Sequence, residues 1–229
     1  MQSEQKRIVV IGASRGIGAA VAQHFVQKGD YVLSVSRNQP IAGEWIQADI
    51  STPEGIKSVA DTIGESRLDA LLFMGGVWED GAFTEQYNFM QSSDRETRYV
   101  IAVNTIAPIE LTKQLTQNLV KSDNPRAIFI GSLSGLDNSA SIEVANTASK
   151  FGLRGAAQAL KLALRDYKIG VTVINPDNVA TEEVVADIEE GRFSQQVPIP
   201  LADIISAIEW ILTLSKTVDI GEINMQQKS

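Results

Sequence analysis

The chain has 229 residues, of which 44% are hydrophobic and 21% are charged, the composition of an ordinary globular protein. It contains no cysteine, which excludes disulfides, thiol catalysis and cysteine-ligated metals, and its single histidine excludes an HExxH zinc site, so we expect no metal. The 28 acidic and 20 basic residues give a formal net charge of -8, which argues against a nucleic-acid-binding protein. No apolar run approaches the roughly 18 residues of a membrane span, and the polar N-terminus lacks a signal peptide's apolar core. We therefore expect a cytoplasmic protein without membrane contact.

Short apolar runs rich in β-branched residues alternate with helical patterns along the whole chain. We expect strands at 7–11, 31–36, 45–48, 69–74, 127–131, 171–175 and 220–225. We expect helices at 16–28, 53–63, 94–120, 145–166 and 201–214, with a local bend at Pro108, an irregular stretch at 75–93, and a loop or short helices at 181–200. This alternation predicts an α/β fold: one Rossmann-like domain over residues 1–229, doubly wound, with a mainly parallel seven-stranded sheet and helices on both faces.

A glycine-rich turn with the sequence Gly-Ala-Ser-Arg-Gly-Ile-Gly joins the first expected strand to the first expected helix. Glycines let the backbone turn tightly and approach a pyrophosphate, while the helix N-terminus offers free N–H groups and a positive dipole. The alternative is a plain strand–helix turn that happens to contain three glycines. The position of the turn, after the first strand, favours a dinucleotide site. The residues expected to touch the cofactor there are Gly12, Ser14, Arg15, Gly16, Ile17 and Gly18.

The end of the second strand indicates which dinucleotide is bound. An NAD site normally has a carboxylate about 20 residues beyond the glycines to hold the ribose 2′-hydroxyl. Here Ser36 occupies that place, and Arg37 follows it. Together with Arg15, this residue provides two guanidinium groups suited to a 2′-phosphate, which favours NADP(H). Two solvated surface arginines are the alternative.

Further motifs follow the glycine-rich turn in order. They are Asp49-Ile50, Val103-Asn104-Thr105, Ile130-Gly131-Ser132, the run Thr-Ala-Ser-Lys-Phe-Gly-Leu at 147–153, and Val-Ile-Asn-Pro at 173–176 with Val179 and Thr181. With these motifs the chain resembles the short-chain dehydrogenase/reductase family over essentially its full length. The resemblance implies a hydride-transfer enzyme in which Ser132 holds the substrate oxygen, Lys150 binds the nicotinamide ribose and Asn104 supports a proton-relaying water. It also implies that Asp49 and Ile50 contact adenine, and that Val179 and Thr181 lie in the stretch that touches the nicotinamide carboxamide.

Three positions depart from the family's pattern. The family's YxxxK motif places a tyrosine four residues before the lysine, where this chain has Asn146, and no tyrosine lies between Tyr99 and Tyr167. The family's NNAG segment is replaced by Phe-Met-Gly-Gly at 73–76, in which Gly75 and Gly76 still permit close approach to the cofactor. An aspartate, Asp177, stands where Pro-Gly is usual.

The missing tyrosine leaves three functions open, because an amide donates a hydrogen bond but is not an acid near neutral pH. In the first, Asn146 and Ser132 polarise the substrate oxygen of an NADP(H)-dependent oxidoreductase, and the proton arrives through water or Lys150. In the second, the chain is a catalytically weak NADP(H)-binding regulatory or scaffold protein. In the third, it is a non-redox lyase or isomerase that uses Asp177, Glu143 or Glu182 as the acid.

The resemblance to the family also has implications for the substrate and for the oligomeric state. It implies a small-molecule substrate, a substrate lid at 181–200, and a homodimer or homotetramer. The lid segment is acidic, which disfavours an acidic substrate. Trp78 follows the fourth expected strand and is a candidate to line the pocket.

Overall fold

The computed structural model describes residues 5–193 and 196–228. Seven strands form one sheet in the order β3-β2-β1-β4-β5-β6-β7, and all six neighbouring pairs are parallel. The strands are β1 (Arg7–Ile11), β2 (Tyr31–Ser36), β3 (Glu44–Gln47), β4 (Ala70–Phe73), β5 (Arg126–Ile130), β6 (Gly170–Pro176) and β7 (Glu222–Met225). The predicted doubly wound α/β fold is therefore confirmed, with a sheet that is wholly parallel.

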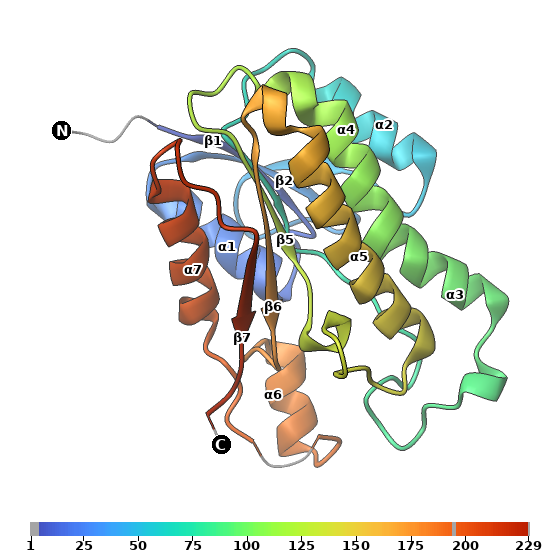
Figure 1. The fold of residues 1–229 in the computed structure, drawn as a ribbon. Coiled ribbons are helices and arrows are strands. Elements are labelled where there is room, and N and C mark those ends of the chain that lie inside the picture. The colour runs from blue at the N-terminus through green and yellow to red at the C-terminus, as the bar shows by residue number, and fades with distance from the viewer. Residues whose placement is uncertain (1–4, 194–195, 229) are drawn as a thin grey trace.

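Helices cover both faces of the sheet (Figure 1). One face packs against α2 (Pro53–Ile63), α4 (Ala107–Leu119) and α5 (Val144–Ala163), and the other against α1 (Gly16–Gln27) and α7 (Leu201–Thr213). Side chains from alternate strand positions enter the two cores, so Val9 and Ile11 lie in one and Ile8 and Val10 in the other. Burial on both faces explains why the strands are continuous apolar runs.

The chain reverses its direction of winding beside β1. Strands β2 and β3 extend the sheet to one side of β1, while β4 pairs with its other side. The connections leaving the carboxyl ends of β1 and β4 consequently diverge, and an open parallel sheet binds its ligands in the crevice at such a point. The short helix α6 (Glu182–Glu189) lies beyond the carboxyl end of β6 (Figure 1).

The helix expected at 94–120 is interrupted earlier than predicted. It consists of α3 (Asp94–Ile101), a π-helical turn at Ala102–Ile106, and α4, with Pro108 inside the first turn of α4. Proline has no N–H to donate to the carbonyl group four residues before it, which here belongs to Asn104. The α-helical pattern is therefore disturbed on the N-terminal side of Pro108, and the π-helical turn contains Asn104. Such turns are frequent at functional sites.

Two absences apply to the described part of the chain. No helix in it combines the length and the apolar character needed to cross a membrane. Nor does it bring together three histidine, aspartate or glutamate side chains that could hold a metal ion.

Candidate active site

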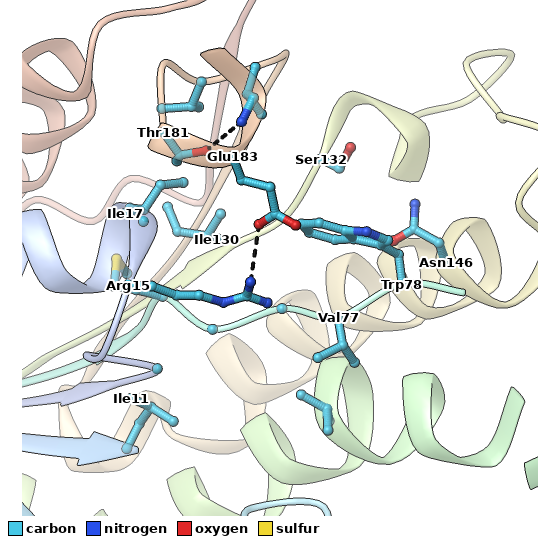
Figure 2. A pocket seen from close by; sticks show the side chains of 18 of the residues that line it. Ile11, Arg15, Ile17, Val77, Trp78, Ile130, Ser132, Asn146, Thr181 and Glu183 are labelled. Atoms are coloured by element: carbon cyan, nitrogen blue, oxygen red, sulfur yellow. Dashed lines mark hydrogen bonds and ion pairs between the residues drawn. The ribbon is translucent and has the colours of Figure 1, made fainter. Parts of the chain in front are cut away.

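A cavity of 310 Å³ opens at the carboxyl end of the sheet. It is lined by residues that follow β1, β2, β3, β4, β5 and β6, and Figure 2 shows how several of their side chains face it. Most of the residues predicted to form the site lie in its wall: Gly12, Ser14, Arg15, Gly16, Ile17, Ser36, Arg37, Asp49, Ile50, Gly75, Gly76, Ser132, Asn146, Lys150, Val179 and Thr181. Of the predicted set, only Gly18 and Asn104 lie outside this wall.

The glycine-rich turn packs against the end of β4. Gly12 has a φ of 84°, and a Cβ atom there would lie 2.4 Å from the Cα of Gly75. A Cβ on Gly18 would lie 2.1 Å from the carbonyl oxygen of Gly12. Gly18 is thus required for packing of α1 against the turn rather than for lining the cavity. Only glycine permits these two close approaches.

The N-terminus of α1 opens toward the cavity without a side-chain cap. Arg15 is its N-cap residue and makes no side-chain cap, and the first turn of the helix contains no acidic residue. Gly16 and Ile17, the first two residues of the helix, line the cavity. The free N–H groups and the helix dipole suit an anionic ligand, so this end of the cavity fits a pyrophosphate.

The two arginines of the predicted 2′-phosphate site have different surroundings. Arg15 forms an ion pair of 3.2 Å with Glu183 of α6, which joins the glycine-rich turn to the predicted lid (Figure 2). Arg37 is exposed, and its guanidinium lies 6.0 Å from the ring centroid of Tyr99. The hydroxyl of Ser36 donates to the carbonyl of Asn38 at 2.7 Å. Neither β2 nor the turn after it places a carboxylate in the cavity wall.

Asp49 lies on the same side of the cavity. Its Oδ1 accepts hydrogen bonds from the backbone N–H and the hydroxyl of Ser51, at 2.9 and 2.7 Å. Burial opposes ionisation of this carboxyl, but the two hydrogen bonds and the charge of Arg37 outweigh it and hold its pKa below the ordinary value. Asp49 is therefore an anionic hydrogen-bond acceptor at neutral pH.

Ser132, on the loop after β5, and Lys150, on α5, also line the cavity. The Ser132 oxygen accepts hydrogen bonds from the backbone N–H and the hydroxyl of Ser134, at 3.2 and 2.9 Å, so its own hydrogen is available to a ligand. The ammonium of Lys150 donates to the carbonyl of Ile130 at 3.3 Å. Because this ammonium is buried, the pKa of Lys150 is lowered to about 8. It is a buried acid that can release a proton near neutral pH.

Asn104 does not line the cavity but forms hydrogen bonds with residues next to it. Its amide exchanges two hydrogen bonds with the backbone of Val77, accepting from the N–H at 2.9 Å and donating to the carbonyl at 2.7 Å. It also donates to the hydroxyl of Ser149 at 2.9 Å. Asn104 thereby ties the loop after β4 to α5, next to the cavity residues Val77 and Lys150.

Several residues that shape the site escaped the sequence analysis. The carboxylate of Glu79, which is 2% exposed, accepts from the backbone N–H groups of Ala145 and Asn146, at 2.6 and 3.1 Å. It caps α5, whose own N-cap residue Glu143 makes no side-chain cap. One local signal pointed to such a cap. No serine, threonine, asparagine or aspartate directly precedes the helix predicted at 145–166, so its first N–H groups need an acceptor from another part of the chain. The cavity also contains Phe83 and Phe193, for which the sequence holds no comparable signal.

The chain is similar to known proteins over most of its length. Residues 6–191 match the family model described as short chain dehydrogenase. The chain is 27% identical over 212 residues to the 3-oxoacyl-[acyl-carrier-protein] reductase of Salmonella typhimurium, covering 86% of this chain and 84% of that protein.

Two solved structures share the fold over nearly the whole length. A 4-hydroxyisoleucine dehydrogenase complexed with NADH has a TM-score of 0.80 and 24% identity, with 97% of each chain covered. A metagenomic short-chain oxidoreductase in complex with NADP has a TM-score of 0.78 and 23% identity, with 100% of each chain covered. Given the extent of the family match, this chain belongs to the short-chain dehydrogenase family of NAD(P)-dependent oxidoreductases.

Proposed function

We propose that the protein is an NADP(H)-dependent oxidoreductase that transfers hydride to or from a small carbonyl compound or alcohol, with an altered proton-donor site. The supporting observation is that one cavity joins the uncapped N-terminus of α1 to Ser132, Asn146 and Lys150. A binding protein would need the first of these features but not the other three residues. The 3-oxoacyl-[acyl-carrier-protein] reductases to which the chain is similar are named for carbonyl reduction, which agrees with the proposed reaction.

The residues that line each part of the cavity suit a different part of the cofactor. The glycine-rich turn and the first turn of α1 hold the pyrophosphate, and Asp49 and Ile50 contact the adenine. Gly75, Gly76, Val179 and Thr181 line the part of the wall that leads from there toward Lys150. The bound nicotinamide supplies the hydride acceptor or donor.

The preference for NADP(H) rests on charge. Arg15 and Arg37 line the cavity beside Ser36, with no carboxylate from β2 among them. A 2′-phosphate would accept charge-assisted hydrogen bonds from both guanidinium groups, whereas a bare 2′-hydroxyl would gain little from them.

The remaining residues handle the substrate oxygen. The hydroxyl of Ser132 and the amide of Asn146 both face the cavity and donate hydrogen bonds to this oxygen. As hydride arrives and negative charge develops on the oxygen, these donors stabilise it. The Lys150 ammonium supplies the proton, directly or through a water, because the residue four positions before it is Asn146, whose amide is not an acid at this pH.

The test compares the wild type with the Asn146→Tyr variant. Consumption of NADPH is followed over aldehydes, ketones, quinones and enones, and binding of NADPH is measured separately by calorimetry. We expect the wild type to bind NADPH and to turn over part of the panel, and the tyrosine variant to lose that activity. A wild type that binds NADPH but is inactive, beside a tyrosine variant that gains carbonyl reduction, would contradict the proposal and indicate a binding protein.

A further inference from the structure

Three aromatic side chains form one wall of the cavity. Trp78 and Phe83 belong to the loop after β4, and Phe193 follows α6, more than a hundred residues later in the chain. The rings of Trp78 and Phe83 are 5.9 Å apart at 67°, and those of Phe83 and Phe193 are 6.3 Å apart at 86°. Both pairs have the edge-to-face arrangement that aromatic rings prefer.

These rings remain accessible. Trp78 is 40% exposed and Phe83 is 39% exposed, although both line a cavity, and Trp78 projects into it (Figure 2). Edge-to-face packing leaves part of each ring face without a partner. Large apolar surface left open in a cavity indicates a ligand that covers it.

Phe83 is held in its position against a backbone preference. Its φ is 64°, in the left-handed region that a bulky residue rarely adopts. Its N–H donates to Oε1 of Glu143 at 2.8 Å, and that carboxylate is 2% exposed. A strained residue held by a buried partner beside a cavity is the pattern expected where the strain serves the site.

The aromatic wall is connected to the residues proposed to bind the substrate oxygen. Glu79 lies between Trp78 and Phe83 in the loop, and its carboxylate accepts from the backbone of Ala145 and Asn146. The hydroxyl of Tyr87, at the far end of the same loop, accepts from the backbone N–H of Val144. The loop that bears two of the rings is therefore fastened to the N-terminal turn of α5, which bears Asn146.

From this arrangement we propose that the substrate has an aromatic or other planar apolar ring close to the carbonyl or alcohol carbon, and that Trp78, Phe83 and Phe193 select it. The inference rests on the proposed oxidoreductase function. A planar ring stacks against or meets the edges of these aromatic side chains, whereas a flexible alkyl chain contributes area without that geometry and loses more conformational freedom. Phe193 belongs to the predicted lid segment, so a ring bound there contacts the loop after β4 and the lid together.

The first measurement is turnover with three aldehydes of equal carbon number: hydrocinnamaldehyde, its ring-saturated analogue, and nonanal, each with NADPH-loaded protein. We expect kcat/KM for hydrocinnamaldehyde to exceed that of the other two by about two- to tenfold. The Phe193→Leu and Phe83→Leu variants should remove this preference by raising KM for hydrocinnamaldehyde. Phe89→Leu is the matched control, since Phe89 belongs to the same loop, is exposed and does not line the cavity.

The second measurement is independent of turnover. Hydrocinnamamide, which cannot be reduced in this reaction, is titrated into NADP-loaded and free protein by calorimetry. Binding that Phe193→Leu weakens and Phe89→Leu leaves unchanged supports the ring site even if no aldehyde is turned over, in which case only the oxidoreductase proposal fails. Turnover of all three aldehydes at equal efficiency, with no binding of the amide, would overturn the ring site and leave the oxidoreductase proposal standing.

Discussion

The side chain of Glu79 accepts a hydrogen bond from the backbone N–H of Asn146 at 3.1 Å, across 67 residues of sequence. The same carboxylate accepts from the preceding N–H at 2.6 Å, and its negative charge lies at the positive end of the α5 dipole. The helix that bears Asn146 and Lys150 thus begins at a group supplied by the loop after β4. The position of both residues depends on that loop.

Replacing Glu79 with alanine should destabilise the protein. The variant leaves two buried N–H groups without acceptors, and each costs about 1–3 kcal/mol in the free energy of unfolding. Glu79→Gln retains one acceptor oxygen and should lose less. Urea unfolding measures both, and kcat should fall more than KM rises because Asn146 loses its fixed position.

Glu85→Ala is the control for this prediction, since Glu85 is an exposed residue of the same loop. Its unfolding free energy should stay within about 0.5 kcal/mol of the wild type. An equal loss in Glu85→Ala and Glu79→Ala would show that the cap on α5 contributes nothing specific.

Replacing Ser132 with alanine should slow turnover and leave cofactor affinity unchanged. The Ser132 oxygen already accepts two hydrogen bonds, so its hydrogen is the part that serves the substrate. Loss of one donor to a developing oxyanion lowers kcat by about 10²–10³-fold. Stopped-flow turnover and NADPH calorimetry separate the two effects, and unchanged kcat would remove Ser132 from the mechanism.

The cofactor preference should depend on Arg37. In Arg37→Ala the KM for NADPH should rise by about 10- to 100-fold, the cost of a charge-assisted hydrogen bond, while the KM for NADH stays nearly constant. Steady-state kinetics with both cofactors at constant ionic strength measures the change. A parallel rise for NADH would assign Arg37 to the fold instead of the 2′-phosphate.

Glu183→Gln should act in the opposite direction. Its carboxylate pairs with Arg15 at 3.2 Å, and removing the charge releases this guanidinium for the 2′-phosphate. Because the pair is exposed, the KM for NADPH should fall by no more than about fivefold. A rise in this KM would show that the ion pair organises the cofactor site rather than competing with it.

Carbonyl reduction should decline with rising pH through the pKa of Lys150, which is about 8. The proton donor is the ammonium, which is present below that pH and lost above it, so kcat/KM should fall tenfold per pH unit on the alkaline side. Lys150→Met should abolish this limb together with most of the activity. A pH-independent rate between pH 7 and about 9 would rule out Lys150 as the acid.

The same shift predicts a change in stability that needs no substrate. Burial lowers the pKa of Lys150 below the 10.5 of the free side chain, so between about 8 and 10.5 the unfolded chain binds more protons than the native one. Stability of the wild type relative to Lys150→Met should therefore rise with pH in this window, by up to about 1.4 kcal/mol per pH unit. Chemical unfolding of both proteins at several pH values measures the difference.

Local patterns predicted most of the fold. The strands at 7–11 and 31–36 and the helix at 53–63 begin and end as expected. The signals that predicted them are continuous apolar runs for the strands, and helical spacing with a proline in the first turn for the helix. Each of these signals depends only on residues close together in the sequence. The helix at 94–120 was wrong in detail, since the sequence indicated a bend at Pro108 but not that the preceding residues Ala102–Ile106 form a π-helical turn.

The strands, most of the helices and the glycine-rich turn could be predicted from the sequence, because turn chemistry and side-chain period act over a few residues. Three contacts could not be predicted and follow from the tertiary fold: Glu79 caps α5, Arg15 pairs with Glu183, and Phe193 joins Trp78 and Phe83 in one wall. The Glu79 cap, the Arg15–Glu183 pair and the Phe83–Phe193 contact join segments dozens to more than a hundred residues apart, which the folding of the intervening chain brings together at the carboxyl end of the sheet. No local pattern specifies such a meeting.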